Sequence, residues 1–240
     1  MNSKKIDGFT LVELAIALMV IGLLIGGVLK GQELIENARI TATIRQLNDY
    51  GTAVQIFKNT YNGIPGDFAK PNRIPNCNNA GGMICGTAGN GNGRIISNDT
   101  TPHEIENFNF FPHLTKAGMI QGPEGGTLDQ MANINIQNIN YNDENAFYFI
   151  PTLPIDTERG YYVKYYHQNY VDAISSIFMD GHYITFTSIS AKILDAIDSK
   201  IDDGKPLSGK VMAADLACTI AGSNIYNHEE TCDAYIDLSF

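Results

Sequence analysis

One acidic side chain stands inside the most apolar stretch of the chain. Between Phe9 and Leu29 the only ionisable residue is Glu13. An apolar run of about 20 residues is long enough to cross a bilayer as a helix. A carboxylate inside such a run costs about 2.5–3.5 kcal/mol at the bilayer centre, so we interpret Glu13 as functional. The simpler alternative is a side chain that reaches the lipid headgroups.

The four cysteines fall into two local pairs, Cys77 with Cys85 and Cys218 with Cys232. Four cysteines allow three connectivities, and the sequence does not choose among them, although local pairing is the simplest. A zinc site is disfavoured, because the chain has no Cys-x-x-Cys pair and its histidines are scattered. Disulfides indicate an oxidising compartment.

Two other patterns invite comparison with ligand sites. Asp202 and Asp203 place two carboxylates side by side, as Ca²⁺ prefers, but the end of a helix explains the same residues. The glycine-rich segment from Gly89 to Gly93 is followed by no Gly-Lys-Ser/Thr, so we interpret it as a flexible turn and not a phosphate loop. The sequence also lacks His-Glu-x-x-His and Gly-x-Ser-x-Gly. We therefore predict no cofactor and no enzymatic activity, and a membrane-tethered hydrolase has no residue set to support it.

Charge and length narrow the class of protein. The formal net charge is −10 over 240 residues, which disfavours a nucleic-acid partner because such proteins carry basic faces. The apolar run is longer than the core of a secretory signal peptide and ends without a small-residue cleavage site. Lys4 and Lys5 precede the run, so the positive-inside rule places the N-terminus in the cytoplasm and the rest of the chain across the membrane.

The helix that carries Glu13 is expected to continue beyond the apolar run. After Lys30 the apolar side chains recur every three or four residues, which is the helical period. We predict one helix from about Thr10 to Asn59, roughly 75 Å long, which ends before the turn residues of Tyr61–Asp67. Half of it would lie in lipid and half against a domain. The apolar positions of the second half are Ile40, Ile44, Leu47, Tyr50, Val54, Phe57 and Tyr61.

The remainder predicts an α+β fold with an antiparallel sheet. Strand-favouring residues occupy 146–150, 161–166, 183–187 and 234–240. A helix is expected over about 190–201, because an apolar stripe there ends before Gly204 and Pro206. Another short helix is expected within 104–118, and the segment 71–101 reads as irregular.

The N-terminal sequence resembles the type IV prepilin and pseudopilin family. That family's motif of Gly, Phe, Thr, Leu, an aliphatic residue and Glu is present from Gly8 to Glu13. The resemblance implies that a prepilin peptidase cuts between Gly8 and Phe9 and methylates Phe9. Residues 1–8 would be a cleaved leader, 9–29 the transmembrane half of the helix, 30–60 its amphipathic half, and 61–240 a periplasmic globular domain. The implied type IV pilin-like fold packs the long helix on an antiparallel sheet, here with additional loops and a short helix.

The resemblance implies a structural subunit of a pilus-like filament, either a minor pilin or a type II secretion pseudopilin. Glu13 of one subunit would pair with the new α-amino group on Phe9 of a neighbour. The implied partners are the peptidase, other pilin or pseudopilin subunits, an inner-membrane platform with a cytoplasmic ATPase, and lipid before assembly. Some pseudopilins bind calcium in a C-terminal loop, which keeps Asp202 and Asp203 as a weak calcium candidate. The alternative is an adhesin or DNA-uptake module on the same inner-membrane anchor, although the acidic charge weighs against DNA.

Overall fold

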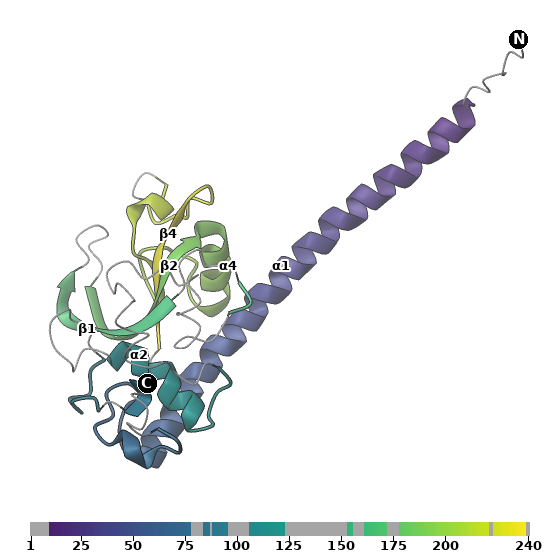
Figure 1. Ribbon diagram of the computed structural model, residues 1–240. Helices are drawn as coiled ribbons and strands as arrows, with labels where there is room; N and C mark the ends of the chain where they lie inside the picture. Colours follow the sequence, from purple (N-terminus) through teal and green to yellow (C-terminus); the bar gives the residue numbers. More distant parts are fainter. Residues whose placement is uncertain are drawn as a thin grey trace, which may run out of the picture.

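One long helix leads into a globular part (Figure 1). The computed structural model describes residues 10–77, 84–86, 88–95, 106–122, 153–155, 161–171, 178–220 and 223–238. Helix α1 covers Leu11–Tyr61, a length of 51 residues, which corresponds to about 76 Å. It ends at Asn62, whose left-handed backbone (φ 55°) lets its N–H donate to the Lys58 carbonyl. The prediction of one continuous helix is confirmed.

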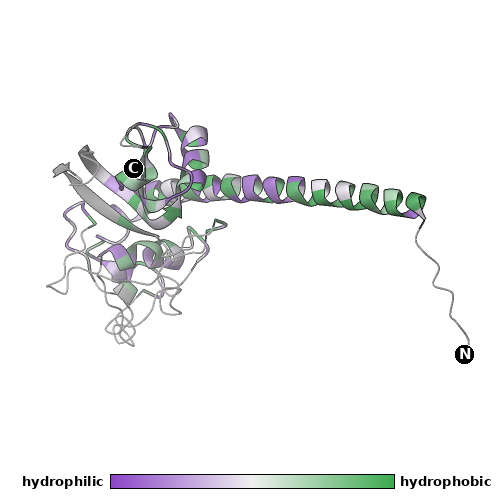
Figure 2. Ribbon diagram, turned by 90° about the horizontal axis from the view of Figure 1, so that it is seen from above, coloured by the Kyte–Doolittle hydropathy of each residue, from purple (hydrophilic) through white to green (hydrophobic). Residues whose placement is uncertain are grey.

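The two halves of α1 have different surroundings. Every residue from Thr10 to Lys30 is exposed, and Figure 2 shows this bare half as hydrophobic along most of its length. Among the described residues, α1 is the one helix that is long and apolar enough to cross a membrane. The second half buries one stripe of side chains at helical spacing. These buried residues are Ile40, Thr43, Leu47, Tyr50, Ala53, Val54 and Phe57.

A four-stranded antiparallel sheet forms the centre of the globular part. Its strand order is β1-β2-β4-β3, with Ile184 of β2 opposite Ile236 of β4. Three strands contain or overlap the runs predicted at 161–166, 183–187 and 234–240, whereas the three-residue β3 was not predicted. The run at 146–150 lies outside the described residues. The strands are β1 (Tyr161–Val171), β2 (Phe178–Ser190), β3 (Val211–Ala213) and β4 (Thr231–Asp237).

Short helices join α1 to the sheet. Both α2 (Glu106–Lys116) and α4 (Ala191–Ile201) pack against α1, and α4 also contacts three of the strands. Phe57, Phe111 and Leu194 contribute to one hydrophobic core with the inner side chains of the sheet. The fold is therefore α+β and pilin-like, with α1 packed on two helices and sharing one hydrophobic core with the sheet. The described residues also include three 3₁₀ turns: η1 (Pro71–Arg73), η2 (Ile84–Gly86) and η5 (Leu216–Cys218).

Candidate functional site

Glu13 is the acid of a capping box at the start of α1. Its Oε2 accepts hydrogen bonds from the Thr10 backbone N–H at 2.9 Å and from the Thr10 hydroxyl at 2.8 Å. In return, the Glu13 N–H donates to Thr10 Oγ1 at 3.3 Å. A capping box satisfies helix N–H groups that have no partner within the helix. Within one chain the carboxylate is thus held by neutral donors, and no cation contacts it among the described residues. Gly8 and Phe9 lie outside the described residues.

The bare half of α1 exposes a continuous apolar surface. Leu11 is 88% exposed and Leu23 is 79% exposed, and the large side chains between them are at least half exposed. Soluble monomers rarely expose apolar surface on this scale, which marks a contact with membrane or with another protein. A Cβ added at Gly22, Gly26 or Gly27 would meet nothing within 4 Å, so the bare half leaves its glycines open to close approach by a partner helix.

Both local cysteine pairs are bonded in the structure. Cys77 joins Cys85 with their Cα atoms 5.4 Å apart, and Cys218 joins Cys232 at 5.9 Å. All four cysteines are buried. The first bridge closes the loop that follows η1, and the second ties η5 to β4. The described part of the chain thus contains the simplest of the three connectivities.

The irregular segment after α1 is organised by buried polar side chains. Asp67, only 2% exposed, accepts hydrogen bonds from three successive backbone N–H groups of the glycine-rich loop. The donors are Gly91 at 2.6 Å and Asn92 at 3.2 Å to Oδ1, and Gly93 at 2.6 Å to Oδ2. Consecutive N–H groups of this kind form an anion-binding concavity. The loop that the sequence suggested was a flexible turn is therefore a cradle for an internal carboxylate.

His113 of α2 connects this segment to α1. Its Nδ1 accepts the Gly66 N–H at 2.9 Å, and its Nε2 lies 3.0 Å from the Cys85 carbonyl, which fixes a neutral tautomer that donates from Nε2. The ring stacks on Phe57 with an interplanar angle of 3°. Complete burial lowers the pKa of His113 to about 4, against the opposing effect of the Cys85 carbonyl. The group is thus a structural, uncharged histidine at neutral pH.

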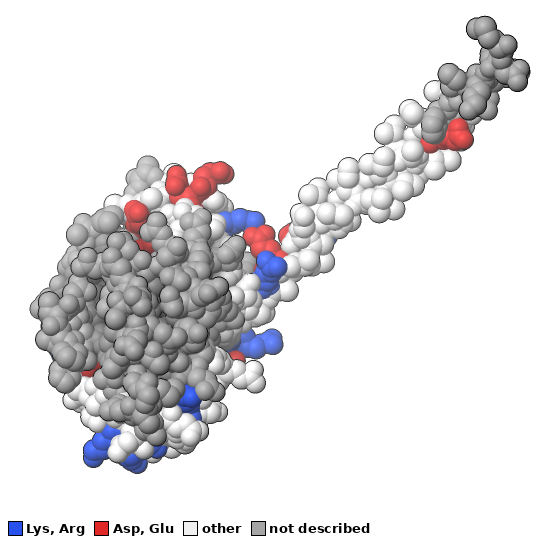
Figure 3. Space-filling view, in the orientation of Figure 1, with Lys and Arg blue, Asp and Glu red and all other residues white. Residues whose placement is uncertain are grey.

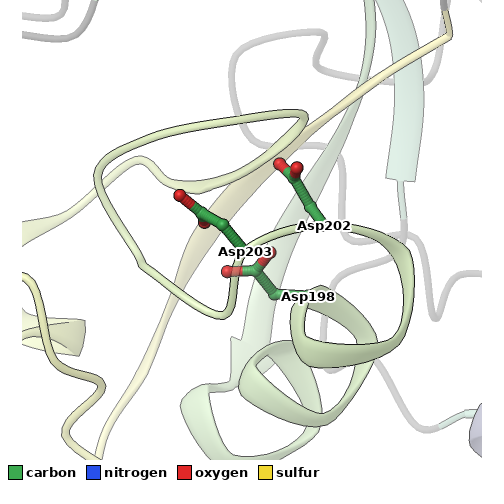
Figure 4. Close-up of side chains that lie close together, drawn as sticks. All are labelled: Asp198, Asp202 and Asp203. Carbon is green, nitrogen blue, oxygen red and sulfur yellow. The ribbon is translucent and has the colours of Figure 1, made fainter.

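Asp202 and Asp203 lie at the end of α4, where the structure adds Asp198 to them (Figure 4). One carboxylate oxygen from each lies within 4.8 Å of the others. Asp198 is fully buried, and its Oδ2 accepts the Tyr226 hydroxyl at 2.8 Å, whereas its Oδ1 has no partner among the described residues. Asp198 was not predicted from the sequence, although its spacing of four residues from Asp202 is one that brings side chains together on a helix.

The two exposed acids of this cluster already have protein donors. Asp202 accepts the Lys210 N–H. Asp203 accepts the Lys205 N–H at 3.0 Å and the Ser208 hydroxyl at 2.9 Å. These bonds fasten the end of α4 to the loop that precedes β3. A calcium ion takes six to eight oxygen ligands, so the internal donors favour the helix-end interpretation. Calcium binding stays a prediction.

Replacing Asp198 should show how much the burial of its carboxylate lowers the free energy of unfolding. Burial raises the pKa of Asp198 to about 6, against the hydrogen bond from Tyr226. Because the folded pKa exceeds the unfolded one, this group favours folding below about pH 4, and that contribution is lost as the pH rises through about 6. Asp198→Asn keeps an acceptor for Tyr226 and should raise the free energy of unfolding by about 2 kcal/mol at about pH 8, with no gain near pH 3.5.

Urea unfolding of the wild type and Asp198→Asn at both pH values, with calcium chelated, measures this difference. His113 is present in both proteins, so its own pH dependence cancels. A variant less stable than the wild type at the higher pH would contradict the prediction. Added calcium that stabilises only the wild type would instead identify the cluster as a calcium site.

The chain has an α+β, pilin-like fold, and its first helix is long and apolar enough to cross a membrane. In a comparison with protein families, the model of the prokaryotic N-terminal methylation motif matches residues 3–29. This match supports a type IV pilin-type or pseudopilin-type prepilin, and it points to a structural subunit. No curated protein and no solved structure matches the chain significantly.

Proposed function

We propose that the chain is a structural subunit of a type IV pilus-like filament, either a minor pilin or a type II secretion pseudopilin. In this proposal a prepilin peptidase removes residues 1–8 and methylates Phe9. Residues 9–29 hold the protein in the inner membrane and residues 61–240 face the periplasm. A platform protein and a cytoplasmic ATPase then move the subunit from lipid into the filament, where it contacts other pilin or pseudopilin subunits.

The observation that carries this proposal is the division of α1 into a bare half and a packed half. The packed half fastens the helix to the globular part through the core around Val54 and Phe57, which are completely buried. The bare half retains a surface of exposed large apolar side chains and one carboxylate. Lipid can cover this surface before assembly, and the helices of neighbouring subunits can cover it afterwards, because both surroundings are apolar.

Processing at Gly8 offers the most direct test of the proposal. The peptidase must bring its catalytic groups close to the backbone, and a side chain at this position would obstruct them. Gly8→Val should therefore leave the full-length precursor in the membrane, whereas the wild type should begin with a methylated Phe9. The measurement is the intact mass and N-terminal sequence of the full chain from cells that contain a prepilin peptidase.

Gly31→Val is the matched control. A Cβ at Gly31 meets nothing within 4 Å, and this glycine lies in the middle of α1, well away from the cleavage position. Its processing should match that of the wild type. Cleavage of Gly8→Val at the same bond, or wild-type protein that keeps residues 1–8 in the presence of active peptidase, would contradict the assignment.

A further inference from the structure

The two ends of the globular part carry exposed charges of opposite sign. We define the proximal acidic surface as Glu229, Glu230 and Asp233, and the distal basic surface as Lys70 and Arg73. All five residues are exposed. Figure 3 shows acidic side chains at the top of the globular part and basic side chains at its lower end, with further basic side chains where the globular part meets α1. Because the whole chain has a net charge of −10, a cluster of bases at one end is unexpected.

Contacts with α1 place each surface along the helix. The carbonyl of Glu230 accepts the Ala191 N–H at 3.0 Å, and the next residue, Lys192, pairs with Glu36 at 3.0 Å. The proximal acidic surface therefore lies near the level of Glu36. At the other end, Lys70 and Arg73 line a hollow of about 280 Å³ together with Tyr61, and Arg73 Nη1 donates to the Tyr61 carbonyl at 3.4 Å.

The two levels are slightly farther apart than the bare half is long. At 1.5 Å per residue, the bare half from Thr10 to Lys30 spans about 30 Å, and the levels of Glu36 and Tyr61 are about 37 Å apart along α1. A second copy displaced by about 37 Å towards the start of α1 would place its globular part beside the bare half of the first copy. Its distal basic surface would then face the proximal acidic surface of the first copy.

Most charges on the two surfaces lack an ion-pair partner within the described part of the chain. Lys70, Glu229 and Glu230 form no ion pair with any other described residue, and the bond that Arg73 makes goes to a backbone carbonyl. Like charges gathered on one surface repel one another until an opposite surface covers them. Exposed pairs each contribute little to affinity, but complementary patches speed association and fix its register.

We infer that the proximal acidic surface of one copy docks on the distal basic surface of a second copy, so that copies of this chain follow one another along a filament. The inference rests on the proposed function and adds to it an axial contact between globular parts. Under this inference, two copies of the chain can be adjacent subunits of one filament. Ionic strength should weaken the contact, because salt screens exposed charges.

Charge reversal tests the inference in cells that assemble filaments from the full chain. The double variants Glu229→Lys/Glu230→Lys and Lys70→Glu/Arg73→Glu should each reduce sheared, sedimentable filament by about tenfold, since each replaces attraction by repulsion at several pairs. The quadruple variant restores opposite signs and should recover most of the filament. Lys210→Glu, an exposed reversal outside both surfaces, should assemble normally. Protease resistance of the unassembled proteins checks that every variant folds.

Two outcomes would overturn the inference. One is normal assembly of both double variants, and the other is a quadruple variant as defective as either double variant. Glu13→Ala, measured in parallel, distinguishes an error in the docking contact from an error in the proposed function. If Glu13→Ala fails to assemble while the charge variants assemble normally, only the docking of the two surfaces is wrong. If every variant assembles normally, the assembly role of α1 is wrong as well.

Discussion

Glu13→Ala is expected to insert in the membrane and be processed normally, yet to be lost from filaments. The bare half of α1 becomes more apolar when its only acid is removed, so insertion should not suffer. Assembly should suffer, because the proposed partner of Glu13 is the α-amino group created on Phe9 of a neighbour. Removing one partner of a buried ion pair costs about 3–5 kcal/mol. A loss of about 3 kcal/mol reduces the equilibrium constant for adding a subunit by more than about 100-fold.

Because Glu13 also belongs to the capping box, a second variant can separate the effect of its charge from the effect of the cap. Glutamine can also accept from the Thr10 N–H, so Glu13→Gln keeps the start of the helix and removes only the charge. If the ion pair governs assembly, Glu13→Gln should fail as completely as Glu13→Ala. If the cap alone matters, only the alanine variant should fail. Both variants are compared by the amount of chain in sheared filaments relative to the amount in the membrane.

Glu33→Ala is the matched control for these variants. Glu33 is a second exposed acid on α1, but it lies beyond the apolar run and pairs with Lys30 at 2.7 Å within the same chain. Its loss should change filament yield little, because exposed pairs contribute at most about 1 kcal/mol. Normal incorporation of both Glu13 variants would refute the assembly role of that residue.

Helical periodicity made α1 and α4 predictable from the sequence. Both helices combine an apolar stripe with clear stop signals, at Asn62 for α1 and at Gly204 for α4, and both lie within a few residues of their predicted bounds. The strands were found by their β-branched and aromatic residues, but β1 and β2 are longer than predicted and β4 begins three residues earlier than predicted. The three-residue β3 carries too short a pattern for alternation to show, and it exists because it pairs with residues 234–236 of β4.

The polar organisation of the segment after α1 was not predictable in the same way. Asp67 and His113 act through partners 24 to 47 residues away, and no local spacing announces such contacts. One signal was present: the run from Gly89 to Gly93 offers closely spaced glycines, which suit a loop whose N–H groups converge on an anion. The run lacks the Gly-Lys-Ser/Thr of a phosphate loop, and the anion that its N–H groups bind is a carboxylate of the same chain.

Asp67→Ala is expected to destabilise the globular part strongly. It removes the acceptor of the Gly91, Asn92 and Gly93 N–H groups and leaves a gap beside them. Hydrogen bonds to a charged group are each worth about 1.5–3 kcal/mol, although water can replace part of that here because the loop is exposed. We expect the free energy of unfolding to fall by about 2–4 kcal/mol. Urea unfolding of the detergent-solubilised chain, followed by circular dichroism, measures the change.

Two further variants test whether the loss of stability comes from the Asp67 carboxylate itself: Asp67→Asn and Asp49→Ala. The asparagine keeps one oxygen for Gly91 and Asn92, but its amide group faces the Gly93 N–H, so donor meets donor. Its loss should be about half that of the alanine variant, since only one of the two oxygens is replaced. Asp49 is an exposed aspartate of α1, and Asp49→Ala should change stability by about 0.5 kcal/mol or less.

The backbone around Asp67 leaves no room for another group to replace its carboxylate as the acceptor of the loop N–H groups. A Cβ on Gly89 would collide with the Asp67 carbonyl carbon, so the backbones of the two segments are in direct contact. The Gly89 N–H donates to the Phe68 carbonyl at 3.2 Å, which holds the two segments together. Loss of the carboxylate should therefore loosen the whole loop and expose it to proteolysis between Gly89 and Ile95. An Asp67→Ala protein as stable and as protease-resistant as Asp49→Ala would show that the cradle does not support the fold.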